Sequence, residues 1–118
     1  MKRFLRENPV VVRNFVKSCI EAVHRLKADR AVGMKIAVKY LRLADTELFT
    51  KTYESSIDEN KLPVKQYPTV EGLKIIIEQL ALTNPRAKNA KPQDFIDARF
   101  LEEFDKGGYI DGLYGRKK

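Results

Sequence analysis

Residues 8–28 have the sequence NPVVVRNFVKSCIEAVHRLKA, and this stretch decides the fold class. Asn8 and Pro9 suit the start of a helix, because asparagine can cap free amides and proline tolerates the first helical position. Apolar residues then recur at spacings of three and four, which places them on one side of a helix. This predicted stripe consists of Val12, Phe15, Val16, Cys19, Ile20, Val23 and Leu26.

The same spacing predicts further helices along the rest of the chain. Asp29, Asp45 and Asp97 can each cap the helix that follows them, and Thr69 begins a further helix. The helix after Asp29 is apolar nearly all round, so it needs covering on two sides, and its Gly33 suits a close contact. The five predicted helices cover residues 8–28, 30–43, 45–56, 69–82 and 98–106.

No stretch shows convincing strand-like alternation of apolar and polar residues, so we expect an all-α fold. The 118 residues are about one domain long. We expect residues 1–118 to form a single helical domain or a fragment of one. A basic tail over residues 115–118 should be frayed.

The basic excess of the chain is concentrated in its first 44 residues. The whole sequence has a formal net charge of +7, and residues 1–44 hold 11 basic and 3 acidic residues. Two interpretations stay open: a solvated surface, or a face that attracts nucleic acid or an acidic protein. The predicted helix 45–56 carries Asp45, Glu47 and Glu54, which disfavours a helix-turn-helix that reads DNA bases.

Side chains suited to catalysis are scarce. His24 is the single histidine and Cys19 the single cysteine, so the usual zinc ligands are too few for a site. Cys19 lies within the apolar stripe, where we expect a small buried hydrophobe. The sequence therefore predicts a non-enzymatic protein with no catalytic residue, no metal ligand and no cofactor. No ligand-binding residue can be assigned.

Apolar runs also fall short of the roughly 20 residues that cross a bilayer, which predicts no membrane span. Arg6, Glu7 and Arg13 interrupt any apolar stretch that would follow the basic start of the chain. We therefore expect no export signal in it.

Four segments in order resemble a known family. They are residues 7–27, ENPVVVRNFVKSCIEAVHRLK; residues 37–56, AVKYLRLADTELFTKTYESS; residues 67–81, YPTVEGLKIIIEQLA; and residues 91–114, KPQDFIDARFLEEFDKGGYIDGLY. Together they resemble the C-terminal part of substrate-binding proteins of ABC importers of the nitrate/sulfonate/taurine type. That superfamily also contains thiamine-precursor-binding proteins.

The resemblance implies a role in small-solute uptake, with a small solute and an ABC permease as partners and a periplasmic or extracytoplasmic location. It also implies a parent of more than twice this length, in which two lobes built on β-sheets close on the solute. The segments found here correspond to the closing helical portion. No residue of this chain matches a solute-contacting motif, so the chain alone is not expected to bind solute.

Helices that cover a sheet in a larger protein leave apolar surface bare when the sheet is missing. Bare patches of more than a few hundred Å² usually contact a partner. We therefore expect the chain to self-associate, with the predicted helix 30–43 as the main source of uncovered apolar surface.

Overall fold

The computed structural model describes residues 2–41 and 47–116, and every regular element in this part of the chain is helical. It confirms the predicted all-α fold. The α-helices and the two 3-10 helices, η1 and η2, are α1 (Lys2–Glu7), α2 (Pro9–Ala28), α3 (Arg30–Leu41), α4 (Glu47–Ser56), α5 (Val70–Ala81), η1 (Pro85–Asn89), η2 (Pro92–Phe95), α6 (Arg99–Lys106) and α7 (Tyr109–Leu113).

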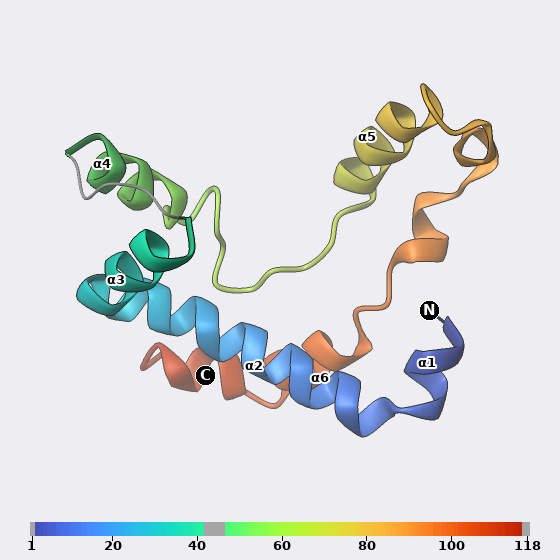
Figure 1. The fold of residues 1–118 in the computed structure, drawn as a ribbon. Coiled ribbons are helices and arrows are strands. Elements are labelled where there is room, and N and C mark those ends of the chain that lie inside the picture. Colours follow the sequence, from blue (N-terminus) through green and yellow to red (C-terminus); the bar gives the residue numbers. More distant parts are fainter. Residues whose placement is uncertain (1, 42–46, 117–118) are drawn as a thin grey trace.

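The helices outline an open U (Figure 1). The long helix α2 runs along the bottom with α6 beside it, α3 and α4 rise at one end, and α5 stands at the other. The molecule measures 44 × 37 × 24 Å, and its radius of gyration is 17.1 Å. A compact chain of this length would have a radius of gyration of about 13.5 Å. The structure is therefore much more open than a compact domain.

The main core lies where α6 and α7 pack on α2, and we call these three helices the base. Ile20 from α2 meets Phe104 from α6 and Ile110 from α7, and Val64 reaches the same core from the segment before α5. Gly108 adopts a left-handed conformation with φ of 75°, which allows α7 to turn back directly after α6. In the base, helices from near both ends of the sequence thus pack together.

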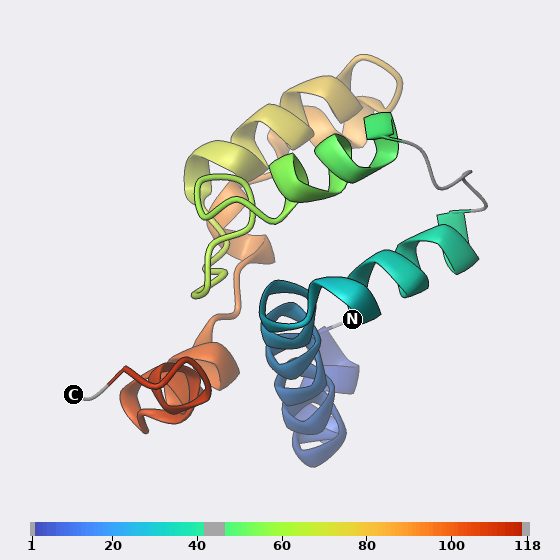
Figure 2. The same cartoon turned by 90° about the vertical axis from the view of Figure 1, so that its left-hand side faces the viewer.

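The second body consists of α5, η1 and η2, and we call it the arm. Helix α5 packs on both 3-10 helices, but no comparable packing joins it to the base within the described residues. The Thr69 hydroxyl accepts a hydrogen bond from the Gly72 amide and caps α5. Figure 2 shows the arm and the base as separate groups of helices. No residue of α5 is buried.

Helices α3 and α4 meet at an exposed ion pair, in which Arg30 and Glu54 are 2.9 Å apart, and at one close contact. Gly33 of α3 faces Tyr53 of α4 so closely that an added Cβ would lie 1.8 Å from the tyrosine hydroxyl. That hydroxyl donates a hydrogen bond of 2.7 Å to the Leu26 carbonyl at the end of α2. Burial raises the pKa of Tyr53. The predicted close contact at Gly33 is therefore present.

The five predicted helices occur with ends shifted by at most one residue where they can be compared, but two short helices, α1 and α7, were not predicted. Asn8 does not cap α2 with its side chain, because α1 precedes it; its side-chain amide donates to the Phe4 carbonyl instead. Asp45 and the boundary between the predicted helices 30–43 and 45–56 lie outside the described residues.

At the start of the predicted frayed tail, the Arg116 amide donates to the Asp111 carbonyl and closes α7. Residues 117–118 of that tail lie outside the described part of the chain.

Candidate interaction surface

One side of α2 remains uncovered. Only Ile20 of the predicted apolar stripe is buried. Phe15 is 68% exposed and Cys19 is also exposed, so the prediction of a buried cysteine is wrong. Val11 lies one turn before Phe15 and is exposed as well. Because α6 and α7 cover a strip narrower than the stripe, Val11, Phe15 and Cys19 form an uncovered row at spacings of four, which we call the base face.

The arm carries a second uncovered apolar surface. Ile76 and Leu80 of α5 lie one turn apart and are both exposed, Ile76 by 58%. Their neighbours Leu73 and Ile77 are partly covered. Ile76 and Leu80 therefore flank the side of α5 that packs on η1 and η2, and we call them the arm face. Ile75 is exposed on a third side of α5, which makes this helix apolar over most of its circumference.

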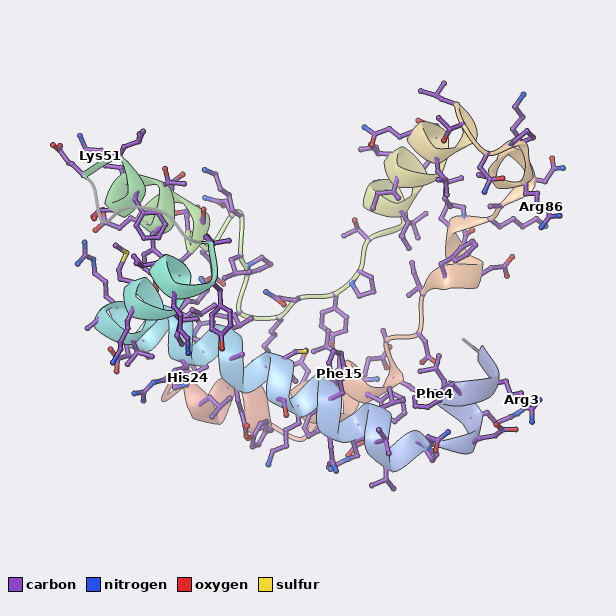
Figure 3. The ribbon with its side chains drawn as sticks, viewed as in Figure 1. Arg3, Phe4, Phe15, His24, Lys51 and Arg86 are labelled. Atoms are coloured by element: carbon purple, nitrogen blue, oxygen red, sulfur yellow. The ribbon has the colours of Figure 1, made fainter. Side chains whose placement is uncertain are left out.

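Helix α3 also exposes apolar side chains, as its sequence predicts. Ile36, Tyr40 and Leu41 are exposed, and on the neighbouring helix α4 Leu48 is 75% exposed. On α4 itself the buried residues are Phe49 and Tyr53. Figure 3 labels Phe15 on α2, Lys51 on α4 and Arg86 on η1, which mark the bottom and the two raised ends of the U.

The total accessible area also shows how much surface the open molecule leaves uncovered. The molecule exposes 9126 Å². A compact protein of 13.6 kDa exposes about 6,600 Å², so the excess is about 2,500 Å². An uncovered patch of more than a few hundred Å² usually marks a contact with another protein surface. The surface best suited to a function is therefore an apolar contact surface spread over the base and the ends of the U.

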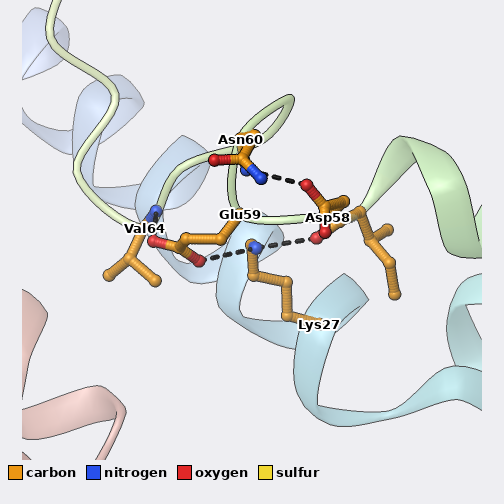
Figure 4. A network of polar contacts seen from close by, with 6 residues as sticks. Lys27, Asp58, Glu59, Asn60 and Val64 are labelled. Carbon is orange, nitrogen blue, oxygen red and sulfur yellow. Dashed lines mark hydrogen bonds and ion pairs between the residues drawn. The ribbon is translucent and has the colours of Figure 1, made fainter.

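Two polar clusters fasten the segment between α4 and the arm to the base. In the first, shown in Figure 4, the Lys27 ammonium donates to the Ile57 carbonyl at 2.8 Å and to the Glu59 carboxylate at 3.0 Å. The Val64 amide donates to the other Glu59 oxygen at 3.0 Å. The hydrogen bond from the Val64 amide has the largest effect on the pKa of Glu59, followed by that from the Lys27 ammonium, and both lower this pKa.

The second cluster lies farther along the segment. The Lys65 ammonium is 2.7 Å from the Asp105 carboxylate and 3.0 Å from that of Asp111. Hydrogen bonds to Asp105 and then to Asp111 raise the pKa of Lys65. The Tyr67 hydroxyl donates to the same Asp105 carboxylate at 2.9 Å. The segment is therefore held on the base as far as residue 67, immediately before the arm begins.

Most of the basic residues near the start of the chain are engaged by carboxylates. Of the nine whose side chains are described in residues 1–44, six form ion pairs. Arg13, for example, is 2.7 Å from Glu103 and also lies over the Phe104 ring. Three have no carboxylate partner within the described residues: Arg6, Lys35 and Lys39. A continuous row of free cations, which nucleic acid would favour, is not found in this part of the chain.

His24 and Cys19, the two residues with catalytic potential, are placed differently. The His24 ring lies edge-on to the Tyr114 ring at 4.8 Å, so it takes part in packing at the end of the base. Cys19 borders a hollow of about 210 Å³ between α2, the 64–68 segment and the start of α6. Among the described residues no group of three or more His, Cys, Asp or Glu side chains is suited to hold a metal ion.

A larger hollow of about 560 Å³ lies between α1 and η2. Arg6, Phe95 and Asp94 are among its lining residues, together with the exposed ion pair of Asp97 and Arg99, whose closest atoms are 3.1 Å apart. None of its lining residues is buried. The hollow is thus a wide, shallow depression with mixed charges rather than an enclosed ligand site.

No family model, curated protein or solved structure matches the chain. No helix in the described residues has both the length and the apolar character needed to span a membrane. The dominant feature of the described residues is their uncovered apolar surface. The sequence predicted such a surface for residues 30–43 but not for the base face, because spacing does not reveal how much of a stripe is covered.

Proposed function

We propose that the chain is the non-catalytic C-terminal helical portion of a solute-binding protein of an ABC importer, of the nitrate/sulfonate/taurine type. The observation that supports this proposal is the excess of about 2,500 Å² of accessible surface over a compact chain of the same mass. Helices that evolved to cover other layers of a larger protein would have this property. In the complete receptor, the two lobes would cover the apolar surface.

The division of the chain into base and arm fits the same role. Each body offers an apolar face, the base through Phe15 and its neighbours and the arm through Ile76 and Leu80. A portion that closes a larger fold must contact it at more than one place, and two bodies joined by extended segments are suited to that. Solute recognition and the contact with a permease would then reside in the whole receptor outside the cytoplasm, and the isolated chain would bind no solute.

Reading the gene and its transcript on the 5′ side of the Met1 codon tests this origin. The proposal expects an in-frame extension that encodes a leader and alternating strand-forming segments. A stop codon in frame shortly before Met1 would contradict it. Calorimetric titration of the isolated chain with nitrate, taurine and an alkanesulfonate provides a second test, in which the proposal expects no heat of binding.

A second candidate function is that of an independent basic module that binds nucleic acid or an acidic protein. Arg6, Lys35 and Lys39 lack a carboxylate partner in the described residues, and the chain has a net charge of +7. Titration with a labelled DNA duplex at two salt concentrations separates the two candidates. Appreciable affinity that falls steeply with salt would favour this second function, since released counterions cause that dependence.

A further inference from the structure

We propose that two copies of the isolated chain associate by exchanging arms, so that the arm face of one copy packs on the base face of the other. The arm face is Ile76 and Leu80, and the base face is Val11, Phe15 and Cys19. The inference goes beyond the proposed function, because it depends on these two faces and not on descent from a solute-binding protein.

The two faces match in chemistry and in the spacing of their residues. Each is a row of neutral side chains at a spacing of four, which is the pattern of two helices that pack along each other. Helix α5 also carries Glu71, Lys74 and Glu78, of which the last two lie close enough to form an ion pair of 3.9 Å. The helix therefore brings little net charge to the contact, although both copies are basic.

The connections of the arm permit the exchange. The chain is fastened to the base as far as Tyr67, and Pro68 and Thr69 then lead into α5 without further bonds to the base among the described residues. On the return path, Ile96 has an extended backbone with φ of −99° and ψ of 125°, and it joins η2 to the base. Because the arm does not pack on its own base, moving it to a second copy disrupts no core.

The accessible area is large enough for a second copy to be the occupant. A stable interface buries about 800 Å² on each partner, and each copy exposes about 2,500 Å² more than a compact chain does. Reciprocal exchange places both faces of each copy in contact with the other copy, so it forms a closed dimer with twofold symmetry and leaves neither face free to extend the assembly. The net charge of +7 on each copy opposes the association, so added salt should strengthen it.

Sedimentation of the full chain over a rising concentration series tests the association, and alkylation of Cys19 tests its geometry. Cys19 is exposed in the single copy and lies within the base face, so the proposal expects its alkylation to slow by about tenfold when the dimer predominates. A chain that remains monomeric at high micromolar concentration would overturn the proposal. A dimer in which Cys19 still reacts at the monomer rate would overturn it too.

Matched variants identify the faces. Ile76→Lys and Leu80→Lys should each weaken the dimer by about tenfold or more, while Leu48→Lys, at a more exposed apolar position on α4, should leave it unchanged. Because all three side chains are exposed, the variants should keep the wild-type circular dichroism. Equal weakening by all three would contradict the assignment of the arm face.

A disulfide provides a positive test of the exchange. In Ile76→Cys, oxidation at a concentration where the dimer predominates should join residue 76 of one copy to Cys19 of the other, which peptide mapping detects. Absence of that linkage would overturn the arrangement. These outcomes are separate from the test of the proposed function: a stop codon before Met1 would contradict the receptor origin and leave the dimer standing.

Discussion

The base and the arm consist of similar amphipathic helices but differ in how their apolar sides are covered. In the base, Ile110 is 0% exposed and meets Ile20, Val64 and Phe104. In the arm, α5 has no buried residue, although its apolar content is high. A helical apolar stripe thus indicates where a helix forms, whereas contacts between residues far apart in sequence decide whether the stripe becomes part of the core. The arm is thus a body whose apolar face the described residues leave uncovered.

Truncation of Ile110 should have the largest effect. Ile110→Ala removes side-chain atoms from the centre of the base and should lower the free energy of unfolding by about 2–5 kcal/mol. Ile76→Ala in the arm is the matched control and should change it by less than about 0.5 kcal/mol at a concentration where the chain is monomeric. Urea titration followed by circular dichroism measures both. Equal losses would mean that the arm is as well packed as the base.

Gly33→Ala tests the α3–α4 end of the U, which is intermediate in burial between the base and the arm. The new Cβ would overlap the Tyr53 hydroxyl at 1.8 Å, so the buried ring or the whole of α4 has to move. We expect a loss of about 1–3 kcal/mol in the free energy of unfolding. Gly112→Ala is the control, because no atom lies within 4 Å of its Cβ position. A neutral Gly33→Ala variant would show that α3 and α4 are not held together in solution.

Removal of one hydroxyl should have a smaller effect at the same end. Tyr53→Phe keeps the ring but deletes the hydrogen bond of 2.7 Å to the Leu26 carbonyl. The loss should be about 1 kcal/mol in thermal or urea unfolding. Tyr40→Phe, at an exposed ring on α3, serves as the control and should be neutral. If both variants behave alike, this hydrogen bond does not hold α4 against α2.

The smallest effect should come from the cluster that fastens the segment before the arm. Hydrogen bonds from Val64 and Lys27 lower the pKa of Glu59 below its ordinary value of 4.5. Its contribution to stability is therefore complete above pH 4.5 and is lost as the pH falls through the lowered pKa. Glu59→Gln should be slightly less stable than the wild type near neutral pH, and the two should converge in acid.

Urea titrations at several pH values measure this convergence, with Glu71→Gln on the arm as the control. A difference between Glu59→Gln and the wild type that does not change with pH would contradict the role given to the carboxylate.

The sequence predicted the longer helices well, because the spacing of apolar residues is a local property. Helix α7 was missed since its five residues are too few to show a period. The uncovered base face was missed for another reason. Phe15 and Ile20 belong to the same stripe, and only the position of α6 and α7, some 80 residues later, determines that Ile20 is buried and Phe15 is not.

The charge pattern along the sequence did not predict which basic residues form ion pairs. Eleven basic residues in the first 44 indicate a basic face, yet partners such as Glu103 and Glu59 lie far away in the sequence. Their ion pairs become visible only when the two ends of the chain meet in the base.

Small-angle X-ray scattering of the full chain, extrapolated to zero concentration, is the most direct test of the open U. This open geometry leaves the apolar faces of the single copy uncovered until a partner surface binds them. It predicts a radius of gyration near 17.1 Å at infinite dilution and forward scattering per unit mass that rises with concentration. A radius of gyration near 13.5 Å, with no rise, would mean that the arm folds onto its own base and would contradict the account.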